Sequence, residues 1–293
     1  MRGPPVARGA PDRYSRHVDS LCILGVRVDD VTFAEALALL REFVASRAPH
    51  YVVTPNPEFV MAARQDAAFR AALNGAALAI PDGGGLLLAA RLWGRPFREQ
   101  VRGTDLVYRL ARLGARDGQR WFLLGAAPGV AEAAGRRLIA RYPGLQVVGT
   151  FGGSPHPADD AEARAAIRAA GPVDVVLVAY GAPGQELWMA RNVAALGVPV
   201  AIGVGGVLDF ISGRVRRAPR WVRDLGLEWL FRLLVQPRRW RRQLALPRFA
   251  LLALLATPRE RARLQRSHHA RPRVPSARAI RDGAGWGIEG ESA

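Results

Sequence analysis

Lysine is absent from this chain of 293 residues, although the chain is strongly basic. All 42 of its basic residues are therefore arginines, and against 25 acidic residues they give a formal net charge of +17 at pH 7. The arginine guanidinium keeps its charge at any physiological pH and can bind a phosphate through two parallel hydrogen bonds. A polyanionic partner is expected, and the charge alone fits nucleic acid, an anionic membrane surface or a phosphorylated substrate equally well.

Cysteine and long apolar runs are also scarce. Cys22 is the only cysteine, which excludes an internal disulfide and a cysteine-based zinc site, so a reducing cytoplasm is the expected compartment. The first twenty residues carry charges and prolines without the apolar core of a signal peptide. The longest uncharged apolar run in the last third, residues 249–256, is far shorter than the roughly 20 residues that span a bilayer, so no transmembrane helix is expected.

Several motifs of common enzyme classes are missing. Neither of the glycine-rich loops that link a strand to a helix, residues 125–129 and 181–186, is a Walker motif or a complete G-x-G-x-x-G sequence, which disfavours an ATPase or a dinucleotide-binding enzyme. It has no Asp-x-Asp, no histidine spacing typical of a metal site and no Gly-x-Ser-x-Gly. We therefore expect neither a metal ion nor a cofactor.

What is present predicts an α/β fold. Between residues 22 and 213, short runs rich in β-branched residues alternate with segments of helical period, a pattern typical of βαβ units. We expect a Rossmann-like, mainly parallel sheet with helices on both faces. The predicted strands are residues 50–54, 77–80, 120–124, 145–148, 174–179 and 198–204, and the predicted helices are residues 57–73, 130–142, 159–170 and 185–196.

The composition changes after residue 213, where strand patterns end and helical segments rich in arginine and tryptophan begin. Four parts are expected. They are a disordered tail (1–20), a Rossmann-like catalytic domain (21–213), a basic helical appendage (214–257) and an arginine-rich tail expected to be disordered (258–293).

Ligands of open α/β sheets bind beyond the carboxyl ends of the strands, so polar residues in those loops are the candidates for a site. Thr54 and Asn56 follow the first predicted strand, either as site residues or as caps of a helix that begins at Pro57. Asp82 follows the second strand and precedes three glycines. Its carboxylate fits a general base for a hydroxyl nucleophile, and equally a cap or turn residue.

Two further loops and three arginines are candidates for binding phosphate. The loops carry Gly125 and the run Gly181, Gln185 and Glu186, each before a helix whose free amides favour an anion. Arg214, Arg217 and Arg220 follow the last predicted strand closely enough to fold back over its carboxyl end. There they are expected to neutralise a diphosphate leaving group.

A second basic cluster lies further along the chain and includes a tryptophan. Tryptophan and arginine beside an aliphatic face form a pattern typical of a membrane interface, and a solvated basic helix face is the alternative. The cluster consists of Arg238, Arg239, Trp240, Arg241 and Arg242.

Taken together, seven segments in this order resemble the WecG/TagA/CpsF glycosyltransferases, also known as glycosyltransferase family 26. No single segment is decisive, but their order makes coincidence improbable. The segments are TPNPEFVMAARQD, AIPDGGGLLLAARLWG, VRGTDL, FLLGAAPGVAEAA, VVLVAYGAPGQELWM, IGVGGVLDFISGRVRRAP and GLEWLFRLLVQPRRWRRQ.

The resemblance implies an inverting, metal-independent transfer of an N-acetylhexosamine, N-acetylmannosamine in the family, from a UDP-sugar to undecaprenyl-diphosphate-linked GlcNAc. Such a reaction serves bacterial surface polysaccharide or teichoic acid synthesis. It implies Asp82 as the base and Thr54, Asn56, Arg102 and Gln185 as substrate contacts. It also implies that the basic appendage docks at the inner face of the membrane and helps to close the active site.

One departure from the family pattern is visible. The family usually has lysine or arginine before the Gln-Glu pair, where this chain has Gly184. If that cation contacts phosphate in relatives, another arginine must replace it here, which leaves the choice of sugar open.

Alternatives remain at this stage. A nucleic-acid-binding protein accounts for the charge but leaves the ordered α/β loops without a role. A nucleotide-sugar epimerase or dehydrogenase would need NAD and its fingerprint. Within the family, UDP-glucose or another UDP-hexose is an alternative donor. A homo-oligomer is possible, whereas the family resemblance implies no nucleic acid partner.

Overall fold

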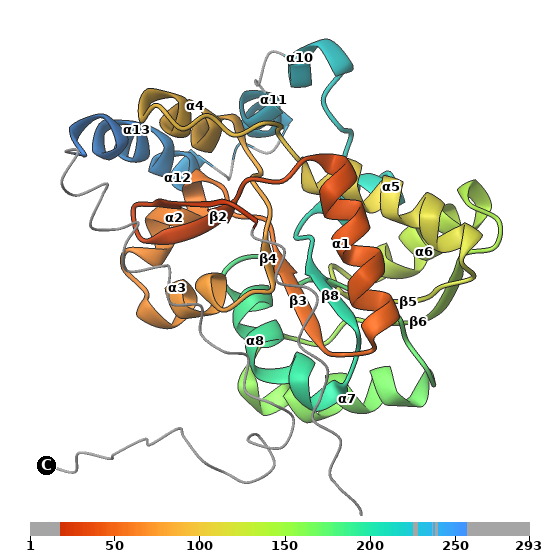
Figure 1. The fold of residues 1–293 in the computed structure, drawn as a ribbon. Coiled ribbons are helices and arrows are strands. Elements are labelled where there is room, and N and C mark those ends of the chain that lie inside the picture. Colours follow the sequence, from red (N-terminus) through yellow and green to blue (C-terminus); the bar gives the residue numbers. More distant parts are fainter. Residues whose placement is uncertain (1–17, 225–227, 236, 238–239, 257–293) are drawn as a thin grey trace, which may run out of the picture.

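The computed structural model describes residues 18–224, 228–235, 237 and 240–256, and its centre is a six-stranded sheet (Figure 1). The strand order is β4-β3-β8-β7-β5-β6, and all neighbours run parallel. The prediction of an α/β fold with a parallel sheet is confirmed. The strands are β3 (His50–Val53), β4 (Leu78–Ala79), β5 (Arg120–Gly125), β6 (Gln146–Phe151), β7 (Val175–Ala179) and β8 (Val200–Gly203).

The central strands are apolar throughout because the sheet is covered on both faces. In β5, Trp121 and Leu123 enter one hydrophobic core, while Phe122 and Leu124 enter the core on the opposite face. The side chains of successive residues in a strand point to opposite faces, so a strand buried on both sides needs an unbroken apolar run.

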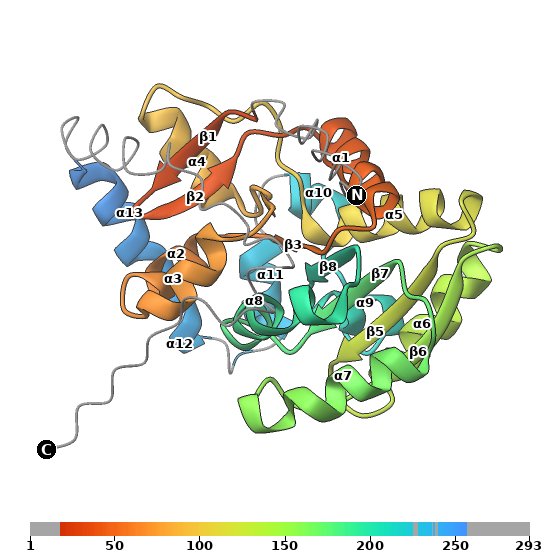
Figure 2. The same cartoon turned by 60° about the horizontal axis from the view of Figure 1, so that its bottom comes forward.

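Helices form a layer on each face of the sheet, as predicted (Figure 2). One layer contains α1 (Phe33–Ser46), α5 (Gly103–Arg116), α6 (Val130–Arg141) and α9 (Val207–Ser212). The other contains α2 (Pro57–Ala63), α3 (Ala67–Asn74), α4 (Gly84–Leu92), α7 (Asp160–Ala169) with the preceding 3₁₀ turn η1 (Pro157–Asp159), and α8 (Gly184–Leu196).

The helix predicted at residues 57–73 is wrong in one respect, because the structure divides it into α2 and α3. Asp66 Oδ1 accepts a hydrogen bond of 2.9 Å from the Phe69 amide, so this carboxylate begins a new helix. An antiparallel hairpin of β1 (Ser20–Ile23) and β2 (Val26–Asp29), which was not predicted, precedes the sheet and packs into the same core as α3 and α4.

Beyond residue 213 the described residues are helical. The helices are α10 (Arg220–Asp224), α11 (Glu228–Val235), α12 (Trp240–Gln243) and α13 (Ala245–Leu255). Phe249 and Ala253 of α13 join the core beside α2 and α4, so this helix is packed onto the sheet domain. None of the described helices is long and apolar enough to cross a membrane. Most of the two predicted tails, residues 1–17 and 258–293, lies outside the described residues.

Candidate active site

The loops at the carboxyl ends of all six strands of the central sheet line one cavity of about 780 Å³. The loops after β3, β4, β5, β6, β7 and β8 contribute to it, and residues of α11, α12 and the start of α13 complete the lining. This is the edge at which a ligand of a parallel α/β sheet is expected. The cavity thus lies at the edge where the sequence predicts a site.

Asp82 lies in this cavity, two residues beyond the buried Ile80, and its carboxylate faces the start of α5. Asp82 Oδ2 accepts a hydrogen bond of 3.2 Å from the Gly103 amide, the first residue of that helix. Burial raises the pKa of Asp82 to about 6, while the Gly103 hydrogen bond opposes the shift, Glu228 adds to it, and Arg102 opposes it. One side of Asp82 remains accessible from the cavity, so the residue is placed to exchange protons there.

Thr54 and Asn56 both line the cavity, and the structure assigns them different local roles. Asn56 Oδ1 accepts a hydrogen bond of 3.0 Å from the Phe59 amide and caps α2, with Pro57 as its first residue. Thr54 does not cap that helix, because its hydroxyl donates a long hydrogen bond of 3.5 Å to the carbonyl of Gly203. The capping alternative thus holds for Asn56. Its side-chain oxygen serves the cap, so the side-chain nitrogen is the group of Asn56 that can contact a ligand in the cavity.

Gln185 joins the loops after β7 and β8. Its Oε1 accepts hydrogen bonds from the amides of Gly181 (3.2 Å) and Gly205 (2.9 Å), and its Nε2 donates to Glu186 Oε1 at 2.6 Å. The Gly181 amide is therefore already used, which weakens the expectation that it binds phosphate. Gln185 has only its second Nε2 hydrogen to offer a ligand, so at the cavity it is a donor.

Glu186 is fully buried and does not line the cavity, so a substrate in the cavity would not reach it in this structure. Burial raises its pKa to about 7, and the Gln185 hydrogen bond opposes that shift. Gly125 does not line the cavity either, although Ala126 and Ala127 of its loop do. A Cβ at position 125 would lie 2.8 Å from Tyr180 Cδ1, so this glycine is required by packing.

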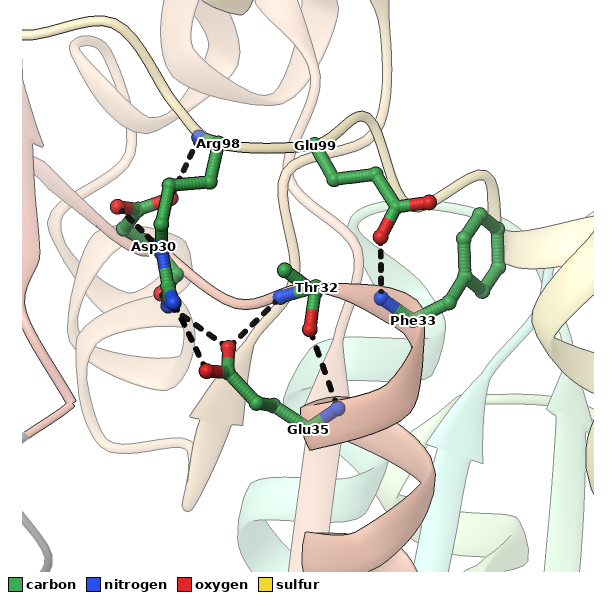
Figure 3. Close-up of polar contacts among 6 residues, drawn as sticks. All are labelled: Asp30, Thr32, Phe33, Glu35, Arg98 and Glu99. Carbon is green, nitrogen blue, oxygen red and sulfur yellow. Dashed lines mark hydrogen bonds and ion pairs between the residues drawn. The ribbon is translucent and has the colours of Figure 1, made fainter.

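Arg102 reaches the cavity from a segment that is anchored to the start of α1 (Figure 3). The Arg98 guanidinium binds both carboxylate oxygens of Glu35, at 2.8 and 2.7 Å, and also Asp30 Oδ2 at 3.1 Å. The Glu99 carboxylate accepts a hydrogen bond of 2.8 Å from the Phe33 backbone amide. The α1 helix in turn begins with a capping box, in which Glu35 and Thr32 exchange hydrogen bonds. These contacts hold the chain that leads to Gln100 and Arg102.

The three arginines after residue 213 that were predicted to contact a diphosphate do not all lie at the cavity. Arg214 lines the cavity, as predicted for a diphosphate contact, whereas Arg217 and Arg220 do not. Arg217 binds both oxygens of Asp105, at 2.6 and 3.0 Å, and lies 3.5 Å from Glu228. Arg217 thus links α5 to α11, and its guanidinium would have to leave Asp105 to reach a diphosphate.

Two cavity arginines were not identified from the sequence, Arg223 and Arg232. The Arg232 guanidinium lies 5.1 Å from the centre of the Phe210 ring, and among the described residues its Nε has no hydrogen-bond partner. Burial lowers the pKa of Arg232. The sequence shows only that Glu228 and Arg232 are one helical turn apart, and it does not reveal that both line the cavity.

The predicted membrane cluster is only partly described. Arg238, Arg239 and the Arg241 side chain lie outside the described residues, and Trp240 is exposed. Arg242 lies at the cavity, where it forms an ion pair of 3.0 Å with Glu58. The structure therefore places Arg242 with the candidate active site.

Within the described ranges, no group of three histidine, cysteine, aspartate or glutamate residues is arranged to hold a metal ion. The cations that surround the cavity are guanidinium groups. They belong to Arg102, Arg214, Arg223, Arg232 and Arg242.

Comparison with known proteins shows the family of this chain. The model of the "Glycosyl transferase WecG/TagA/CpsF family" matches residues 21–263. The chain belongs to this family. It is thus a glycosyltransferase, and the resemblance predicted from seven segments is confirmed.

Relatives with an assigned name are similar over most of their length. Each is named N-acetylglucosaminyldiphosphoundecaprenol N-acetyl-beta-D-mannosaminyltransferase. The protein of Bacillus spizizenii is 35% identical over 70% of this chain and 78% of its own, and that of Bacillus subtilis is 32% identical over 74% and 83%. The protein of Staphylococcus aureus is 31% identical over 78% of this chain and 89% of its own.

Proposed function

We propose that this glycosyltransferase moves N-acetylmannosamine from a UDP-sugar to GlcNAc-diphosphoundecaprenol, with inversion and without a metal ion. The observation that carries the proposal is the meeting of one candidate base, Asp82, with five arginines around a single cavity. The names of the relatives supply the sugar and the acceptor.

An inverting displacement needs a base on one side of the anomeric carbon and stabilisation of the leaving group on the other. Asp82 takes the proton of the acceptor hydroxyl as that oxygen attacks the anomeric carbon. The bond from that carbon to the UDP oxygen breaks, and the departing diphosphate gains negative charge. Arg214 and Arg232, which line the cavity, are the cations that we assign to this charge.

Arg232 also offers a candidate for the cation that the family pattern has at the position of Gly184. Its guanidinium lies so close to the β8 loop that a Cβ on Gly206 would approach one of its nitrogens within 2.2 Å. Gly206 therefore permits Arg232 to lie over the loop. A Cβ at Gly184 would instead meet Pro155 at 2.8 Å, so a side chain there requires the neighbouring loop to move.

The decisive experiment measures UDP release by the purified protein with a panel of UDP-sugars, with and without a short-chain polyprenyl-diphosphate-GlcNAc. We expect release that depends on the acceptor, occurs with UDP-N-acetylmannosamine, and is unchanged by EDTA. Release from UDP-glucose alone would correct the sugar. No release from any donor would refute the proposed reaction.

A further inference from the structure

Five leucines on two adjacent helices face solvent in a chain that buries most of its other large apolar residues. Leu88 and Leu92 belong to α4, and Leu251, Leu254 and Leu255 belong to α13. Each of the five is between 50% and 66% exposed. We refer to these residues as the leucine surface.

The five residues lie on the outer sides of two neighbouring helices. Leu88 and Leu92 are one turn apart on α4, and the spacing of the α13 leucines likewise puts them on one side of that helix. Both helices bury their opposite sides in the same core, through Leu86 on α4 and Phe249 on α13. The Trp93 indole nitrogen donates to the carbonyl of Ala253 at 2.9 Å, which holds the helices side by side (Figure 1).

The charged residues on the two helices and directly beside them in the sequence have one sign. Arg91, Arg95 and Arg248 are exposed on or beside the two helices. No acidic residue occurs between positions 83 and 98 or between positions 229 and 259. Two helices that expose leucines and arginines and carry no carboxylates fit a partner with an apolar interior and an anionic surface.

The leucine surface also borders the cavity. Both helices begin at its wall, since Gly84 and Gly85 of α4 and Leu246 of α13 line it. A partner that covers the leucines therefore lies close to the cavity that Asp82 lines.

We propose that the leucine surface enters the apolar layer of an anionic bilayer and holds the cavity entrance against the membrane. This proposal rests on the proposed function, which requires a lipid-linked acceptor. It extends the membrane contact to α4, a helix of the sheet domain, which the sequence pattern had not indicated. The bilayer then receives the leucines while Arg91, Arg95 and Arg248 contact its headgroups.

Two other occupants fit the charge less well. A second copy of the chain would bring the same arginines toward one another across a symmetric contact. The chain's own residues 257–293 carry eight arginines against four acidic residues, so they share the sign of the surface. A bilayer with anionic headgroups is the partner whose charge complements the arginines.

The test compares full-length variants in co-sedimentation with vesicles of phosphatidylcholine and phosphatidylglycerol. Leu88→Gln/Leu92→Gln and, independently, Leu251→Gln/Leu254→Gln are each expected to bind at least about tenfold more weakly than wild type. Ile139→Gln is the matched control, because Ile139 is an exposed aliphatic residue on α6, in the opposite helix layer, and it is expected to bind as wild type does.

UDP release separates this proposal from the proposed function. With the short-chain acceptor in solution, the turnover of both leucine variants should equal that of wild type. With a long-chain acceptor in vesicles, the two leucine variants should lose turnover, while wild type and Ile139→Gln should not. If wild type, the two leucine variants and Ile139→Gln all bind vesicles equally, the proposal is wrong. It is also wrong if the leucine variants change their oligomeric state without losing vesicle binding. Absence of any UDP release would refute the proposed reaction and leave the vesicle result to decide the surface.

Discussion

Asp82 combines access to the cavity with a pKa of about 6, and burial by the surrounding protein is the main cause of that pKa. The ordinary pKa of an aspartate is 3.8, so folding favours the protonated form. The contribution of this group to stability is present below pH 3.8 and is lost as the pH rises through about 6. The proposed role of Asp82 as a base needs the deprotonated form, so activity and stability are expected to respond to pH in opposite directions.

Asp82→Asn should therefore separate the two effects. We expect turnover to fall by about 10² to 10⁴, the usual contribution of a general base. Above pH 6 the unfolding free energy should rise by about 1 to 2 kcal/mol, because the buried charge is removed while the oxygen of the new amide can still accept the hydrogen bond from Gly103. UDP release and thermal unfolding between pH 5 and 8 measure both effects, and an unchanged turnover would show that Asp82 is not the base.

Glu186 is a positioning residue for Gln185. Its Oε1 accepts from Gln185 Nε2, which turns the Gln185 oxygen toward the loop amides of Gly181 and Gly205. Gly203 leaves room for the pair, since a Cβ there would lie 2.9 Å from Gln185 Nε2 and 3.1 Å from Glu186 Oε1. Because the pKa of Glu186 is raised to about 7, its stabilising contribution is lost as the pH rises through that value.

Replacing Glu186 should depend on the hydrogen-bonding capacity of the new side chain. In Glu186→Gln an amide oxygen can still accept from Gln185, so we expect turnover within about threefold of wild type and a smaller loss of stability above pH 7. Glu186→Leu removes the acceptor, and turnover should fall about tenfold or more. Equal turnover in the two variants, measured by UDP release, would show that Glu186 does not position Gln185.

At the scale of elements, the segment at residues 96–101 connects α4 to α5 and carries Gln100 and Arg102 to the cavity. Its contacts with Asp30 and Glu35 at the start of α1 are exposed, so their contribution to stability is small. Their effect is to fix the position of Arg102 at the cavity. Arg102 Nη2 donates a hydrogen bond of 2.8 Å to the carbonyl oxygen of Arg223. Through Arg102, α1 is thus linked to the helices that close the cavity.

Arg98→Ala should affect catalysis more than folding. We expect the KM for the donor to rise severalfold, while the unfolding free energy falls by less than about 1 kcal/mol, as is usual for an exposed ion pair. Steady-state UDP release and thermal unfolding measure the two quantities. Arg112→Ala, an exposed arginine elsewhere on α5, serves as the control. A large loss of stability with an unchanged KM would contradict the positioning role.

The sequence predicted the elements better than their arrangement. Buried strands such as β5 and β7 have unbroken apolar runs, and their predicted bounds agree with the structure to within one residue. The order of strands depends on packing between distant segments, so no local pattern revealed it. The edge of the sheet and the place of Asp82 followed from the rule for parallel strands. Arg232 was missed because its position depends on how α11 folds over the β8 loop.

At the scale of the whole molecule, the charge of +17 and the leucine surface make separate contributions to binding. Attraction between arginines and headgroups weakens as salt shortens the Debye length from about 10 Å at 0.1 M to about 3 Å at 1 M. Burial of leucines in a bilayer does not weaken in this way, because it depends on apolar area removed from water. Binding to nucleic acid would rest on phosphate contacts and lose about 10³ to 10⁵ in affinity between 50 and 200 mM salt.

A salt titration therefore distinguishes an anionic membrane from nucleic acid, two of the three anionic partners that the composition allows. We expect wild type to retain part of its binding to phosphatidylglycerol vesicles at about 1 M salt, where electrostatic attraction is largely screened. Leu88→Gln/Leu92→Gln should lose that residual binding, and random-sequence oligonucleotides should be released at much lower salt. Co-sedimentation and fluorescence anisotropy measure these affinities. If oligonucleotides bind more tightly than vesicles at every salt concentration, the arginines serve a nucleic acid and the membrane assignment is wrong, whatever sugar the cavity accepts.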